Sequence, residues 1–302
     1  MMNLSKNYFT ATIFFIVGIS LFWLSVRNIE FVRFFETIKA IKIKWLLFSV
    51  FLGYFAFILR ALRWKLMIEP SGHNVRVSKL LHSVVFGYLF NSIIPRSGEI
   101  VRCSTLSKSY KIPISSLIGH VILERLIDIL VLCLCLILVL FLNFEQFILF
   151  SNFFKIPWTL IISLASFAII FILILKKSFF LNEAFSKKIT SFYNGIKDGF
   201  MSFNLLRNKL IFIFYTLLIW LCYFLMTYLC FFCFEELKTL SFQNGLFVMV
   251  AGGLGMIVPT PSGIGSYHFL VIKSMSVLSI GNEISTFYAL TVHTSQTLMV
   301  II

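Results

Sequence analysis

Charged residues are scarce in this sequence of 302 residues: Asp, Glu, Lys and Arg make up 13% of it, whereas hydrophobic residues make up 59%. The mean hydropathy is +0.96. No stretch is both polar enough and long enough to form a separate soluble domain. The sequence therefore predicts one all-α domain over residues 1–302, a polytopic helical membrane protein with about 6–8 membrane segments. A spanning helix needs about 20 mostly apolar residues.

Acidic residues are the scarcer of the charged types: 12 Asp and Glu stand against 26 Lys and Arg, which gives a net charge of +14. In a soluble protein this excess would raise nucleic acid as a partner. Between apolar runs, basic loops instead fix orientation and contact anionic headgroups. We therefore predict a multi-pass protein of the cell membrane with no nucleic-acid partner, and we place the basic loop Lys176–Lys209 in the cytoplasm.

Cysteine occurs six times, mostly within apolar runs, so no disulfide framework is indicated. Cys230 and Cys233 have the spacing of a metal-binding pair, but no second pair or histidine accompanies them in a loop. We interpret them as small core residues. No nucleophile-and-base constellation stands out. The sequence therefore favours a non-enzymatic protein without metal or cofactor.

The charges that remain are concentrated where a membrane protein should avoid them. The sequence reads NSIIPRSGEIVR from Asn91 and then, after a link, ERLID up to Asp128, with apolar runs on both sides. A charge at membrane depth costs at least ~2.5–3.5 kcal/mol on insertion scales, so it is usually paired, facing a cavity or functional. We predict convergence on one polar cavity for the following residues: Arg96, Glu99, Arg102, Glu124 and Asp128.

Two chemical roles are open to these charges. Arginine suits phosphate, because its planar guanidinium donates parallel hydrogen bonds, and Arg96 and Arg102 fit this role. Glu99 would hold one arginine or meet a headgroup amine. On a helix from about Pro113 to Phe144, Glu124 and Asp128 share one face, and Arg125 can pair with Asp128. The alternative is structural: a loop with an ordinary Glu–Arg pair, and a self-neutralised cluster that anchors helices.

Arg60 and Arg63 lie three residues apart, on one helical face, and Trp64 follows them. They are either part of the polar site or a basic and aromatic anchor at the membrane interface. The candidate residues for binding a headgroup or phosphate are Arg60, Arg63, Asn91, Arg96, Glu99, Arg102, Glu124, Arg125 and Asp128.

Two hydrophobic segments are interrupted by proline and glycine, and their sequences echo each other. Leu80–Pro95 runs into IIPRSG, which is Ile93–Gly98, and Val248–Ile272 contains IVPTPSG. Paired interruptions of this kind are typical of transporters built from repeats, and broken backbone at membrane depth must be buried in protein or face water. We expect two re-entrant segments, inverted relative to each other, although either could span fully. The candidate path-lining residues are Pro95, Gly98, Pro259, Pro261, Gly263, Gly265, His268, His293 and Gln296.

Together, these motifs resemble the lysylphosphatidylglycerol synthetase transmembrane-region family of flippase-like membrane proteins. The matching pieces, in order, are Arg60-x-x-Arg63-Trp64, Asn91-x-x-x-Pro95-Arg96-x-Gly98-Glu99-x-x-Arg102, Glu124-Arg125-x-x-Asp128 and Pro259-x-Pro261-x-Gly263-Ile264-Gly265. Ser262 stands where many relatives have Gly, and His268 where many have Glu, so no acidic role carries over there.

The resemblance implies a bacterial inner-membrane protein related to the part of multidomain relatives that moves aminoacylated phosphatidylglycerol between leaflets. Those relatives carry a soluble aminoacyl-transferase domain, which this chain is too short to contain. Our first hypothesis is a flippase or transporter for a phospholipid or other anionic amphiphile, with homo-oligomerisation open. The alternatives are a membrane transferase acting on a lipid-phosphate carrier and a non-transporting accessory subunit.

Overall fold

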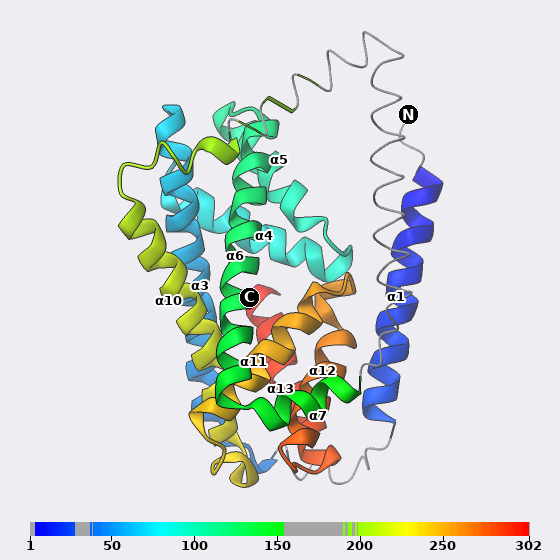
Figure 1. The fold of residues 1–302 in the computed structure, drawn as a ribbon. Helices are drawn as coiled ribbons and strands as arrows, with labels where there is room; N and C mark the ends of the chain where they lie inside the picture. The colour runs from blue at the N-terminus through cyan, green and yellow to red at the C-terminus, as the bar shows by residue number, and fades with distance from the viewer. Residues whose placement is uncertain are drawn as a thin grey trace.

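The computed structural model of the protein describes residues 4–27, 37, 39–153, 190, 193–194, 197 and 199–301. The described part is built of α-helices and short 3-10 turns (Figure 1). Its helices are α1 (Leu4–Val26), α3 (Ile43–Ile68), α4 (Val77–Ile93), α5 (Gly98–Tyr110), α6 (Ile114–Leu142), α7 (Phe144–Asn152), α10 (Lys209–Leu229), α11 (Phe242–Ile257), α12 (Ser266–Val277) and α13 (Asn282–Ile301). The turns are η1 (Glu69–Ser71), η2 (Cys230–Cys233), η3 (Glu235–Leu237) and η4 (Pro261–Gly263). The prediction of an all-α membrane protein is confirmed.

Three helical stretches of the described chain are long and apolar enough to cross a membrane: Ile43–Ser71, Ile114–Leu142 and Lys209–Cys233, of 29, 29 and 25 residues. Shorter apolar helices occur at Phe15–Val26 and Phe242–Ile257. The outer face of α6 exposes large apolar side chains such as Leu130, Leu134 and Phe141. Such a face is stable against lipid tails, whereas water would make it a large apolar patch.

The two interrupted segments form helical hairpins that enter from opposite ends of the molecule (Figure 1). Helices α4 and α5 form one hairpin, and α11 and α12 form the other. Pro95, Pro259 and Pro261 lie in the links, where a residue without an amide proton cannot continue a helix. The tips touch: the hydroxyl oxygens of Ser92 and Ser262 are 3.3 Å apart. We call this contact between residues 92–96 and 257–262 the tip joint.

The segment after Pro95 is the helix α5 rather than a loop. Residues Asn91 and Gly98 explain its start, because the Asn91 side-chain oxygen accepts a hydrogen bond of 2.8 Å from the Gly98 amide. This bond satisfies one of the free donors that every helix N-terminus leaves. The hairpin is tight, since a Cβ atom on Gly98 would lie 2.0 Å from the Gly87 carbonyl oxygen. Glycine is needed at position 98 for close approach.

Charged residues differ between the two ends of the molecule. The end where α3 and α5 finish carries mostly basic residues, namely Lys65, Arg76, Lys79, Lys108 and Lys111 beside Glu69. The opposite end carries a more even mixture, including Lys42, Glu145, Glu235, Glu236 and Lys238. By the positive-inside rule, the first end would face the cytoplasm. Most of the loop Lys176–Lys209 lies outside the described residues, so its cytoplasmic placement stays a prediction.

Candidate functional site

The site begins with two pairs of opposite charge on facing helices. Arg60 and Arg63 come from one face of α3, and Glu124 and Asp128 come from one face of α6, as the helical spacing predicts. Two Arg63 nitrogens donate hydrogen bonds of 2.9 and 3.2 Å to the two Asp128 carboxylate oxygens, and one of these nitrogens lies 3.1 Å from a Glu124 oxygen. Arg60 donates a short hydrogen bond to the same Glu124 oxygen. These contacts cross between helices, so they fix α3 against α6.

Helix α5 adds a third arginine. The Arg102 guanidinium donates to the second Glu124 oxygen at 3.0 Å, and it lies 4.9 Å above the centre of the Trp64 ring. Trp64 is completely buried, so the interpretation of it as an aromatic anchor at the membrane interface is wrong. Glu124, only 1% exposed, thus contacts three arginines.

We call Arg60, Arg63, Arg102, Glu124 and Asp128 the charge cluster. Three positive charges face two negative charges within it, which leaves one positive charge in excess. Arg60, Arg63 and Arg102 are each at most 4% exposed. A buried excess charge is costly unless a counter-ion or a polar group compensates it. The cluster is therefore electrostatically suited to attract an anion.

Hydroxyl groups from α10 complete the shell around the arginines. Arg60 donates to the Tyr223 hydroxyl at 3.0 Å, and Arg63 donates to Thr216 at 3.3 Å. The Tyr88 ring of α4 lies under Arg60. Sequence reasoning missed these residues because each is a single polar group in an apolar run. An isolated hydroxyl in such a run is the only sequence signal, and it does not reveal the partner.

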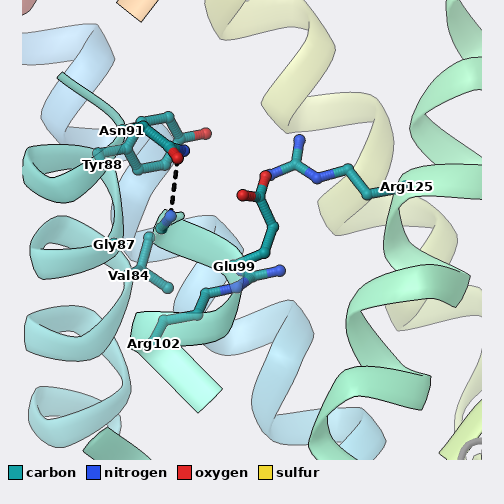
Figure 2. A pocket seen from close by; sticks show the side chains of 8 residues that line it. Val84, Gly87, Tyr88, Asn91, Glu99, Arg102 and Arg125 are labelled. Carbon is teal, nitrogen blue, oxygen red and sulfur yellow. Dashed lines mark hydrogen bonds and ion pairs between the residues drawn. The ribbon is translucent and has the colours of Figure 1, made fainter. Parts of the chain in front are cut away.

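A cleft opens beside the charge cluster, between α4, α5 and α6 (Figure 2). The cavity is small, about 10 Å³ or room for about one water molecule, and its lining includes Asn91, Glu99, Arg102 and Arg125. Figure 2 shows Glu99 reaching toward Arg125, and their nearest oxygen and nitrogen are 3.2 Å apart. The predicted pairing of Arg125 with Asp128 is thus wrong: Asp128 pairs with the arginines of α3.

Several polar atoms at this cleft are buried but lack a partner in the described structure. They are the second carboxylate oxygen of Glu99 and the Nε atoms of Arg102 and Arg125. Nearby on α6, neither ring nitrogen of the buried His120 has a partner in the part of the chain described. Buried groups of this kind usually find a hydrogen bond, so such a set indicates a site for ordered water.

The structure does not bring Arg96 to the charge cluster. Its side chain is exposed and donates to the backbone carbonyl of Ile257, at the end of α11. Its backbone φ is +61°, a conformation that is uncommon for a residue with a side chain. The structure therefore brings Glu99 and Arg102 to the cleft, and Glu124 and Asp128 to the charge cluster beside it, whereas Arg96 belongs to the tip joint.

The second hairpin tip is a separate polar centre. Gly263 and Gly265 adopt φ values of +79° and +83°, and Ser262, between Pro261 and Gly263, has a φ of +49°. Of the other predicted residues, Pro259 precedes the turn, and His268 on α12 and His293 on α13 are buried behind it. Gln296 lies about one helical turn after His293 and is half-buried. Of the predicted path-lining residues, Gly98 lines the cleft, Pro95, Pro259 and Pro261 lie at the tip joint, and the others lie in or behind the second hairpin tip.

The arrangement can hold an anion or polar headgroup through arginine forks. Among the described residues, no group of three or more His, Cys, Asp or Glu side chains could hold a metal ion. Cys230 and Cys233 are buried in an apolar cluster, as the sequence predicted.

The chain matches the family model described as "Lysylphosphatidylglycerol synthase TM region" over residues 11–302. No curated protein and no solved structure matches it significantly.

Proposed function

This chain belongs to the lysylphosphatidylglycerol synthase transmembrane-region family, and from that premise we propose that it binds an anionic phospholipid or similar amphiphile and moves it between leaflets. Membership places it among integral membrane proteins related to phospholipid metabolism. The translocation step is the part that we add.

The observation that carries the proposal is the net positive charge of the buried cluster, which lies beside a small polar cleft. Arg102 belongs to both, because it pairs with Glu124 on one side and lines the cleft on the other. Its Nε and that of Arg125 are buried donors without a partner in the described structure. A phosphate would accept charge-assisted hydrogen bonds from such donors and supply the missing negative charge. The lipid tails would stay outside, against the apolar faces.

The two hairpins supply a route through the membrane in this proposal. We take α4–α5 as a re-entrant hairpin from the cytoplasmic side and α11–α12 as one from the opposite side, in accord with the charge difference between the ends. A headgroup in the cleft would then be separated from the far side by the tip joint. Short broken helices that meet near mid-membrane are a known solution for polar transport paths.

The test measures movement of a headgroup-labelled phosphatidylglycerol across the bilayer of proteoliposomes. Arg102→Lys keeps the charge but loses the fork, and the loss of a bond worth about 1.5–3 kcal/mol predicts a rate roughly 10- to 150-fold lower. Arg76→Lys is the control, since Arg76 is exposed at the start of α4. Equal rates for Arg102→Lys and the parent protein would remove the phosphate role. No movement by the parent protein with any anionic lipid would refute translocation.

A further inference from the structure

Two histidines that the proposed lipid site does not use lie behind the tip joint. The His268 and His293 ring centres are 4.6 Å apart, and the residues are 1% and 7% exposed. His268 belongs to α12 and His293 to α13, so the pair links the second hairpin to the last helix. The Phe22 ring of α1 packs against His268 from another side, with ring centres 5.2 Å apart.

The hydrogen bonds of the pair define its protonation. His293 Nε2 is 2.9 Å from the Ser262 carbonyl oxygen, which can only accept, so this nitrogen carries a proton. His268 Nδ1 accepts a hydrogen bond of 3.3 Å from the Gly265 amide, so this nitrogen must be bare. His268 is therefore neutral in this arrangement. A proton on its Nδ1 would face the Gly265 amide and break the bond that holds the start of α12.

The electrostatic surroundings oppose a charge on either ring. Tyr267 lies beside His293 with ring centres 5.4 Å apart, and Cys230 belongs to the same buried cluster as Tyr267; neither is a carboxylate. On the α4–α5 side the charged group is Arg96, which is positive and bonded to the Ile257 carbonyl. In the part of the chain described, no carboxylate contacts either histidine. A positive charge would be both buried and uncompensated.

Ser262 connects this pair to the tip joint. Its carbonyl oxygen accepts from His293, its hydroxyl contacts Ser92 of the other hairpin, and its φ of +49° is unfavourable for a residue with a side chain. A residue held in such a conformation relaxes when the contacts around it are lost. Any change at the histidine pair therefore acts on the contact between the hairpins.

We propose that His268 and His293 form a proton-binding site that opens the tip joint when it takes up a proton. In the closed joint the pair stays neutral, because burial excludes its charge. In an open joint the rings gain water and can bind a proton. Acid therefore favours the open state, since the state that binds more protons gains stability as pH falls. The ligand of this site is the proton, and the site is distinct from the arginine-lined cleft.

The size of the effect follows from an ordinary histidine, which titrates near pH 6.5. Lowering the pH from 7.5 to 5 would shift the closed-to-open equilibrium by up to about 30-fold for each histidine that is hydrated only when open. Two protonated rings at this separation would repel each other, so one proton is expected. This inference goes beyond lipid movement and can be measured without it.

The experiment uses the purified full chain in lipid nanodiscs, with its six cysteines replaced by alanine and Ser92→Cys and Ser262→Cys introduced. The initial rate of disulfide formation with a soluble oxidant reports the closed joint. The comparison protein also carries His268→Gln and His293→Gln. Glutamine offers an acceptor to Gly265 and a donor to Ser262 but does not titrate. The rate of thiol oxidation itself depends on pH in the same way in both proteins, so this dependence cancels in the ratio of their rates.

We expect the ratio of the parent rate to the glutamine-variant rate to fall at least about twofold between pH 7.5 and 5. A constant ratio would overturn the proton site. If neither protein forms the disulfide at any pH, the tip joint itself is wrong and the proposal falls with it. His293→Gln alone serves as the comparison if the double variant is not monodisperse. Lipid movement is not needed, so this result is independent of the test of translocation.

Discussion

Replacing Glu124 by Gln should be among the most destabilising conservative changes in this protein. The Glu124 carboxylate is buried at the centre of the charge cluster, with one oxygen facing Arg60 and Arg63 and the other facing Arg102. In Glu124→Gln the amide oxygen can still accept from one side. The amide nitrogen, however, would point its protons at a guanidinium. The excess of the cluster would rise from one positive charge to two.

The expected loss can be estimated from these contacts. Two unit charges about 4 Å apart attract by about 4 kcal/mol at an effective dielectric constant of 20, and the carboxylate has three such partners. Desolvation of the charged groups offsets part of that sum. Removing one member of a buried ion pair typically lowers stability by about 3–5 kcal/mol, and we expect a loss in this range. The measurement is the free energy of unfolding from titration with denaturing detergent, followed by circular dichroism.

The matched control is Glu236→Gln. Glu236 is exposed in η3, at the opposite end of the molecule, and the same chemical change there should shift the free energy of unfolding by less than about 0.5 kcal/mol. A loss below about 1 kcal/mol for Glu124→Gln would show that the arginines do not depend on this carboxylate. The argument for a buried cluster with an excess positive charge would then be refuted.

Two further predictions concern the hairpins and the orientation. Gly98→Ala should destabilise the protein by about 1–3 kcal/mol, because its new Cβ atom would collide with the α4 backbone. Gly281→Ala, which meets no atom within 4 Å, should be neutral or slightly stabilising, and equal effects in detergent unfolding would contradict the tight crossing. For orientation, an impermeant thiol reagent should label Gln243→Cys in intact cells and Ser109→Cys only after permeabilisation, each in a cysteine-free background; the reverse pattern would invert the assignment of the cytoplasmic end.

The sequence was sufficient to predict the helical class and the residue types at the site. The helix expected from about Pro113 to Phe144 is α6, and the i,i+4 spacing placed Glu124 and Asp128 on one of its faces. These predictions succeed because helix formation, and the placement of side chains on one helix face, depend on residues close together in the sequence. The presence of charges in an otherwise apolar chain was itself the strongest signal, since the bilayer makes unpaired charges costly.

The pairing of those charges could not be predicted, because it depends on which helices pack together. Arg125 has an acidic neighbour three residues on, yet it contacts Glu99 of another helix, while Asp128 is taken by α3. The position of Arg96, away from the charge cluster, could not be predicted for a similar reason. It precedes the first turn of α5, and its positive φ belongs to the link between the two helices rather than to the face that carries Arg102. No sequence spacing contains that information.

The tip joint has a consequence for the order of events during synthesis. Its two serines are 170 residues apart in the chain, whereas Arg102 and Glu124 are separated by only 22. At about 5–20 residues per second, the ribosome reaches Ser262 roughly 10–30 s after Ser92. Much of the charge cluster can therefore assemble before the second hairpin tip has been synthesised to cover the polar tip of the first hairpin. A chain arrested after α10 should carry paired arginines and an uncovered tip, the state in which this protein most needs a chaperone at the insertion site.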